Sequence, residues 1–102
     1  MRLIQILLPL YDNEGRRFPR AMYDAVRAEL ADRFGGLTAH TRAPAEGIWA
    51  EEGGTPSRDD IVIFEVMADR LDRSWWREYR QTLEREFRQD AIVIRGQEIE
   101  LL

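Results

Sequence analysis

The chain has 102 residues, of which 44% are hydrophobic and 33% charged, and its formal net charge is −4. This length suits a single domain over residues 1–102, and the composition is that of a globular protein rather than a disordered one. Cysteine and lysine are both absent, which excludes disulfides, thiolate catalysis, Schiff-base chemistry and a phosphate-loop lysine. The negative charge argues against nucleic acid or an anionic membrane as the main partner, since both require a clustered positive field.

The first third of the chain predicts a strand followed by a helix. Residues 2–9 are an apolar run too short for a membrane span, and no cleavage signal follows it. We therefore interpret it as a strand of a cytoplasmic protein. Apolar residues then recur at i+4 over 20–34, as on one face of a helix, and Gly35-Gly36 ends this pattern. These apolar residues are Met22, Val26, Leu30 and Phe34.

The rest of the chain predicts three more strands and a second helix. Residues 37–43 are typical of a strand, and Pro44 then interrupts it, which a sheet tolerates at its edge. Residues 60–68 predict the third strand. The second helix is expected over 72–89, with Asp72 or Ser74 as its cap. The last strand combines "AIVIRG" and "EIELL", with a bend expected at Gly96.

This βαββαβ order predicts an α+β fold of the ferredoxin-like type. In that topology a four-stranded antiparallel sheet carries two helices on one face. The first and third strands occupy the middle of the sheet, and the second and fourth its edges. The composition agrees, because the first and third strands are the most apolar and the second carries the proline.

Alternation along the strands separates two faces, because successive residues point to opposite sides. The wholly apolar set is expected to face the helices: Ile4, Ile6, Leu8, Val62, Phe64, Val66, Ile92 and Ile94. The opposite side, here called the open face, combines apolar and polar residues: Leu3, Gln5, Leu7, Ile61, Ile63, Glu65, Met67, Ala91, Val93 and Arg95. Such an apolar face is larger than a monomer usually exposes. We expect a second copy of the sheet to cover it in a homodimer.

Glu65 is a carboxylate in the middle of an apolar strand of the open face. An isolated charge there would be costly, so we expect Gln5, His40, Arg42 or Arg95 as its partner. Two interpretations of a partnered Glu65 stay open, beside a Glu65 that simply reaches solvent. In one, these groups form a polar network that sets how two sheets dock. In the other, they line a ligand cavity in which burial raises the pKa of Glu65 and the residue acts as an acid or base.

Other candidates for a site are few. His40 is the one histidine of the chain, and no cluster of ligands for a metal can be recognised, so we expect no metal and no cofactor. Trp49 follows the edge-strand proline and could close one end of the sheet. We accordingly take Glu65 and His40 as catalytic candidates. The ligand-binding candidates are Gln5, Arg42, Trp49, Glu65 and Arg95.

The order of elements with an apolar open face resembles the dimeric α/β-barrel superfamily, which includes cofactor-independent monooxygenases. "FGGLT", "GIW", the strand-borne glutamate and "EFRQDAIVI" are similar to a group of small bacterial proteins classed as a domain of unknown function. The architecture implies a dimer, while neither resemblance implies any catalytic residue.

Two function classes follow. The first is a homodimeric binding or interaction module whose open face serves assembly and could hold a small molecule. The second is a cofactor-independent enzyme of the monooxygenase, isomerase or decarboxylase type. It would use Glu65, His40 and a tryptophan on a small organic substrate.

Overall fold

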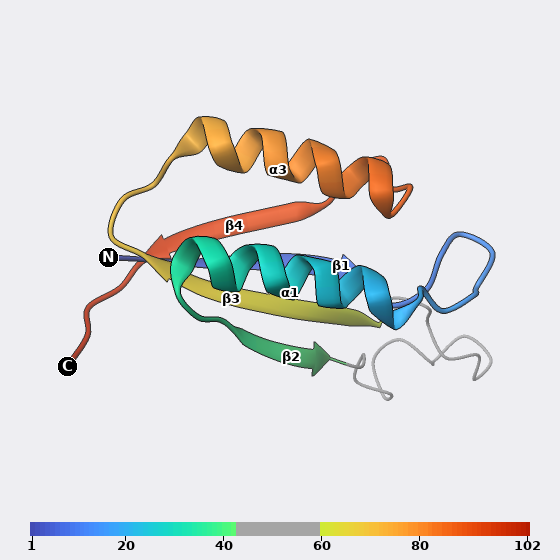
Figure 1. Cartoon of the computed structure of the whole chain (residues 1–102), viewed down its shortest axis with the longest axis horizontal. Helices are drawn as coiled ribbons and strands as arrows, with labels where there is room; N and C mark the ends of the chain where they lie inside the picture. The colour runs from blue at the N-terminus through green and yellow to red at the C-terminus, as the bar shows by residue number, and fades with distance from the viewer. Residues whose placement is uncertain (43–59) are drawn as a thin grey trace, which may run out of the picture.

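The computed structural model describes residues 1–42 and 60–102. The elements in these ranges are β1 (Arg2–Pro9), α1 (Arg20–Phe34), β2 (Thr38–Arg42), β3 (Ile61–Ala68), α3 (Arg73–Glu86) and β4 (Val93–Glu98). The four strands form one antiparallel sheet, and both helices lie on the same side of it (Figure 1). This is the α+β, βαββαβ arrangement of a ferredoxin-like fold, as the sequence predicts.

Local chemistry explains where α1 begins and ends. The helix begins directly after Pro19, whose φ of −59° is already close to the helical value. It ends at Gly35, which takes a left-handed φ of 79° and donates its N–H to the Ala31 carbonyl. Tyr23 ties the helix to the sheet, because its hydroxyl donates to the Pro9 carbonyl at 2.6 Å. Burial raises the pKa of Tyr23 to about 12, so this donor keeps its proton.

The cap of α3 is Asp72, whose side chain accepts a hydrogen bond from the Trp75 N–H at 3.1 Å. The helix spans Arg73–Glu86 and is therefore shorter than the predicted 72–89. Arg88 takes a left-handed φ of 51°, which no helix continues through.

The strand order is β2-β3-β1-β4. β1 pairs with both β3 and β4, so that Ile6 lies opposite Phe64 on one side and Ile94 on the other. β1 and β3 are therefore the central strands, which confirms their predicted positions.

The two faces of the sheet carry the residues that alternation assigns to them. Seven of the eight strand residues predicted to face the helices are buried, with Phe64 fully so, and Ile94 is partly buried. The helices complete this core with Val26, Leu30, Trp76 and Leu83, and Phe87 joins them directly after the end of α3.

The open face is apolar as predicted but unevenly exposed. Met67 and Val93 are 49% and 53% exposed, whereas Ile63 is only 6% exposed. Ile63 lies directly opposite Leu7 on β1 and His40 on β2, and it is not part of the core cluster between sheet and helices. Exposed apolar area is therefore concentrated at the Met67 and Val93 positions.

The last strand differs from its prediction at both ends. The Ile92 N–H donates to the Glu84 carboxylate at 3.1 Å instead of to a neighbouring strand, so β4 begins at Val93. The ladder with β1 runs without interruption through Gly96 to the Arg2–Glu98 pair, so the bend expected at Gly96 is wrong. Beyond that pair the Ile99 N–H makes one more bond to the Met1 carbonyl, and the rest of the predicted "EIELL" strand, residues 99–102, does not form.

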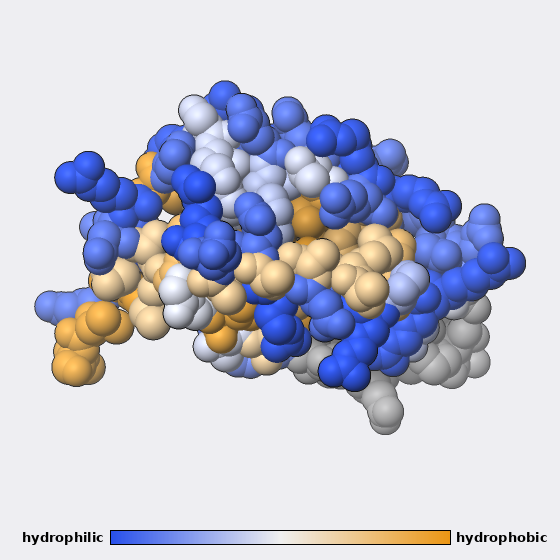
Figure 2. Space-filling view, viewed as in Figure 1, coloured by the Kyte–Doolittle hydropathy of each residue, from blue (hydrophilic) through white to orange (hydrophobic). Residues whose placement is uncertain are grey.

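Aromatic side chains fill the space between the two helices. Trp76 is buried, while Trp75 lies at the rim, stacked on Tyr79 with ring centroids 4.9 Å apart. The Arg33 guanidinium lies 4.2 Å from the centre of the Trp75 ring. Adjacent residues on a helix cannot both face the core, which explains this division. Seen from the helix side, hydrophobic residues form a band along α1 that extends toward α3, with hydrophilic residues around it (Figure 2).

Within residues 1–42 and 60–102, no helix is long and apolar enough to cross a membrane.

The two glycines after α1 provide a matched test of the helix end. At Gly35 an added Cβ would meet no atom within 4 Å, so only the left-handed φ of 79° penalises a side chain. Gly35→Ala should therefore lower the free energy of unfolding by about 1–2 kcal/mol. At Gly36 space is also open and φ is not left-handed. Gly36→Ala should leave stability unchanged or raise it by up to about 1 kcal/mol, measured by denaturant unfolding. Equal effects of the two substitutions would contradict this account.

Candidate functional site

A row of polar side chains crosses the open face, and the pairing of the strands creates it. Gln5 on β1 lies directly opposite Glu65 on β3 and Arg95 on β4. Directly opposed residues project to the same side of a sheet, close enough for their side chains to interact. His40 on β2 joins them from a diagonal position, because Thr38 is the residue opposite Glu65. We call Arg95, Gln5, Glu65 and His40 the polar row.

Hydrogen bonds connect the whole row. The Gln5 amide Nε2 donates to Glu65 Oε1 at 2.6 Å, and Gln5 Oε1 accepts from Arg95 Nε at 2.8 Å. His40 Nε2 lies 3.3 Å from Glu65 Oε2. The Gln5 amide thus uses its donor on the carboxylate and its acceptor on the guanidinium. Gln5 thus links the Arg95 guanidinium on the edge strand β4 to the Glu65 carboxylate on β3, although these two charged groups do not touch.

This arrangement favours the ionised form of Glu65. The hydrogen bond from Gln5 is the main cause that lowers the pKa of Glu65, and the His40 hydrogen bond and charge act in the same direction. Partial burial raises the pKa but is outweighed. The direction is opposite to the raised pKa expected for a catalytic acid, so that expectation is wrong for the chain as described. At neutral pH, Glu65 is a carboxylate that can accept hydrogen bonds or attract a cation.

A hollow of about 400 Å³ opens beside the polar row, and Glu65 forms part of its wall. The other walls come from the end of α1, the glycine turn, and the strands next to it. They are Leu3, Phe34, Gly35, Gly36, Leu37, Thr38, Val66 and Met67. Leu3, Glu65 and Met67 line the hollow from the open face, whereas Phe34, Leu37 and Val66 belong to the core or pack against it. This hollow, here called the open-face hollow, therefore places one ionised carboxylate among mainly apolar side chains, with Thr38 as a further polar group. Gly35 and Gly36 border the hollow without side chains, and the space around both Cβ positions is empty to 4 Å.

Four of the six residues proposed as site residues from the sequence come together in the polar row. Arg42 lies in β2 opposite Ile61, two positions along the strand from His40, and its side chain is outside the described part of the structure. Trp49 also lies outside the described residues.

Sequence reasoning missed Thr38 and the Gly35-Gly36 turn as parts of a site. Alternation places Thr38 on the open face if Leu37 and Ala39 face the helices, but only the register shows that Thr38 stands opposite Glu65. The glycines were recognised as a helix end, which is also the position that borders the hollow.

The described residues contain no cluster of side chains that could bind a metal ion. Among residues 1–42 and 60–102, no three histidine, cysteine, aspartate or glutamate side chains are grouped so that they could hold a metal ion.

Comparison with known proteins supports the fold. No protein-family model matches the chain. None of the curated proteins matches it either, so the resemblance to the domain-of-unknown-function group gains no support. A solved structure described as a phage SAM lyase in complex with S-methyl-5′-thioadenosine is similar in fold, with a TM-score of 0.55 and 14% sequence identity. The similarity covers 95% of this chain and 80% of the other. At this identity the likeness establishes a shared ferredoxin-like fold.

The lowered pKa of Glu65 predicts a defined pH dependence of stability. Its ionised form stabilises the folded chain above the ordinary pKa of 4.5, and this contribution is lost as the pH falls through the lower folded-state value. Glu65→Gln removes the contribution. The variant should be less stable than the wild type by about 1–2 kcal/mol at pH 7, and the difference should shrink below pH 4.5.

Denaturant unfolding at a series of pH values measures this difference. Glu100→Gln, which removes an exposed carboxylate in the C-terminal tail, is the matched control and should keep the wild-type pH profile. A Glu65→Gln variant whose profile also runs parallel to the wild type at all pH values would show that the polar row does not favour ionisation.

Proposed function

We propose that this protein is a homodimeric small-molecule-binding module whose ligand lies on the open face beside Glu65. The observation that carries the proposal is the hydrogen-bonded polar row next to the open-face hollow. Ligand sites typically combine apolar walls with a few polar groups held in fixed positions. Gln5 and His40 each engage one oxygen of the Glu65 carboxylate, and an ionised carboxylate has about four acceptor positions, so it can accept further hydrogen bonds from a ligand.

The charge of the site selects a class of ligand. Glu65 is ionised at neutral pH and lies among Leu3, Phe34 and Met67. An organic molecule with a cationic or hydrogen-bond-donating group and an apolar part complements this arrangement. The volume of about 400 Å³ suits a molecule of metabolite size. The fold relative with S-methyl-5′-thioadenosine bound supports the choice of a small molecule over a macromolecule.

The proposed dimer is supported by the exposed apolar part of the same face. Met67 and Val93 are about half exposed although they lie on well-formed strands. Sheets pack face to face through such side chains, and a twofold arrangement uses the same surface of both copies. In this proposal Met67 borders the open-face hollow, so a partner sheet would close the ligand site as well as cover the apolar surface.

A second candidate is an enzyme that works without a cofactor. It is favoured by the description of the fold relative as a SAM lyase. Glu65, with its lowered pKa, is a weak proton acceptor and suits the stabilisation of a cationic group, such as a sulfonium, better than acid catalysis. His40, half exposed beside it, is the proton acceptor of this alternative.

The dimer is tested by placing a charge on the open face. Met67→Glu should convert a dimer of about twice 12.0 kDa into a monomer, because a buried carboxylate facing its twofold copy is strongly unfavourable. Ala28→Glu, on the exposed side of α1, is the matched control and should remain dimeric. Light scattering coupled to size exclusion measures both masses. A wild-type chain that is monomeric at micromolar concentration would contradict the dimer.

The ligand site is tested by thermal shift with S-methyl-5′-thioadenosine, SAM and a panel of small organic amines. A compound that binds the folded chain raises the unfolding temperature by mass action. Glu65→Gln should weaken a cationic hit by roughly tenfold or more, since it removes the charge but keeps the shape. Glu100→Gln should not change the response. Hits that bind both variants equally would place the ligand elsewhere.

The same samples separate the two function classes. Incubation with SAM followed by chromatography for S-methyl-5′-thioadenosine detects lyase activity directly. Formation of that product, lost in Glu65→Gln, would favour the enzyme, whereas binding without product favours the binding module.

A further inference from the structure

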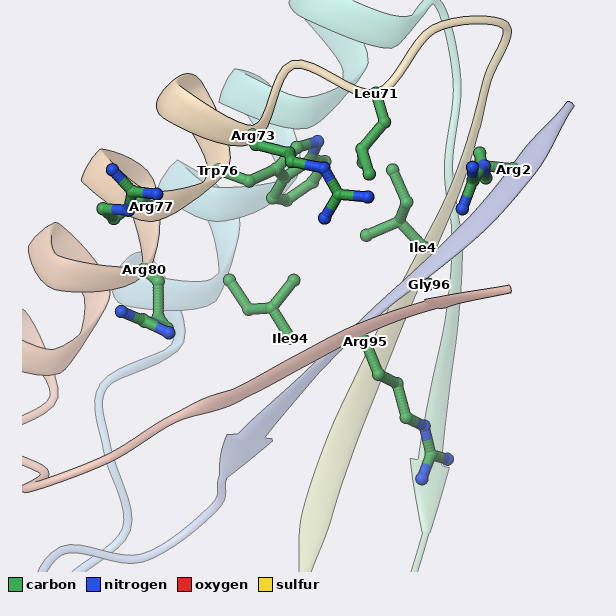
Figure 3. A pocket seen from close by; sticks show the side chains of 10 residues that line it. All are labelled: Arg2, Ile4, Leu71, Arg73, Trp76, Arg77, Arg80, Ile94, Arg95 and Gly96. Atoms are coloured by element: carbon green, nitrogen blue, oxygen red, sulfur yellow. The ribbon is translucent and has the colours of Figure 1, made fainter. Parts of the chain in front are cut away.

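A second hollow, on the helix side of the sheet, is lined by arginine side chains. It lies between α3 and the adjoining strands and has a volume of about 440 Å³. Arg73, Arg77 and Arg80 extend from α3, and Arg2 extends from β1 (Figure 3). Arg95 borders it from β4, but its side chain points to the opposite side of the sheet, where it bonds Gln5. We call the hollow formed by the other four arginines the arginine groove.

The positive charge of the arginine groove is poorly balanced. No carboxylate is among the residues that line it. Within residues 1–42 and 60–102, Arg2, Arg73 and Arg77 form no ion pair, and Arg80 lies 3.8 Å from Glu84. This concentration of cations stands out in a chain whose net charge is −4.

The position of these arginines on α3 is unfavourable for the helix itself. Arg73 is the first residue of α3, where the helix dipole is positive and favours acidic side chains, yet the first turn contains none, and Arg77 follows one turn later. They are also spaced i,i+4, so they repel each other along the helix face. The cap, Asp72, directs its carboxylate to the Trp75 N–H and to Arg33 at 3.6 Å. An anion in the groove would offset all of these repulsions at once.

We propose that the arginine groove binds a small molecule that carries a phosphate or diphosphate group. Guanidinium groups bind phosphate oxygens through two parallel hydrogen bonds, which makes arginine the preferred residue for such recognition. The floor of the groove is apolar, with Leu71 and Ile94 partly buried, and provides contact for the organic part of the ligand. The volume suits a molecule of nucleotide size. A nucleic acid would require a longer basic path than one groove on a negatively charged chain.

This site is independent of the polar row. Ile4 and Ile94, which border the groove, face the helices, whereas Glu65 faces the other way. The apolar layer of the sheet separates the two, so either site could bind while the other does not.

The test is a calorimetric titration of the whole chain with ADP, inorganic pyrophosphate and adenosine at about 0.15 M ionic strength. ADP should bind at one saturable site and more tightly than pyrophosphate, because only ADP also contacts the apolar floor. Adenosine, which lacks phosphate, should not compete. Arg73→Gln combined with Arg77→Gln should weaken ADP by roughly tenfold or more. Arg16→Gln combined with Arg20→Gln removes the same charge far from the groove and should leave affinity unchanged.

Thermal unfolding of the ligand-free double variant gives a readout that a structural role would not produce. Removing the repulsion at the start of α3 should leave its unfolding temperature unchanged or raise it, and a fall would contradict our assignment of these arginines. Absence of saturable binding by ADP and pyrophosphate would overturn the proposal, as would equal loss in the control variant. Binding of a short RNA in place of both small probes would assign the groove to nucleic acid and also overturn it.

Discussion

The pairing of β1 with two neighbours at once is the constraint on which the rest of the structure depends. Ile6 lies between Phe64 and Ile94, and all three side chains enter the core under the helices. One step along the strand, Gln5 lies between Glu65 and Arg95 on the open face. The burial of Ile6 and the hydrogen bonds of Gln5 therefore result from the same register. A slip by one residue would exchange the two faces and bury the polar row in the core.

Gln5 is the central residue of the candidate site, because its neutral amide bonds both charged groups beside it. A direct ion pair between Arg95 and Glu65 would have to span the width of β1. The amide instead satisfies both charged groups with one side chain of fixed geometry, at 2.6 and 2.8 Å. Its hydrogen bond is also the main cause that lowers the pKa of Glu65, and His40 acts in the same direction against the effect of burial. The chemistry available at the open face is therefore set by an uncharged neighbour.

Particular residues show how much could be predicted from the sequence. Alternation correctly assigned Ile4, Phe64 and the other helix-facing strand residues to the core. It also assigned Glu65 to the open face. Both assignments depend only on the period of two along a strand, and the identity of the neighbouring strands is not needed for them. Four of the six proposed site residues meet on the open face. The direction of the Glu65 pKa could not be predicted, because it depends on which side chain lies directly opposite. The end of β4 was also misjudged, since the ladder with β1 determines it and the β propensity of "EIELL" does not.

The adjacent residues Ile94 and Arg95 show how one edge strand contributes to two sites of opposite charge. Ile94 borders the arginine groove on the helix side, while the Arg95 side chain joins the polar row on the open face. β4 has β1 as its neighbour in the sheet, so this single ladder fixes both contributions. The register is held because the alternative would place a guanidinium in the apolar core beside Ile6 and leave Ile94 exposed, and both changes are unfavourable. The packing of partly buried Ile94 against the core therefore favours the register that also places Arg95 beside Gln5.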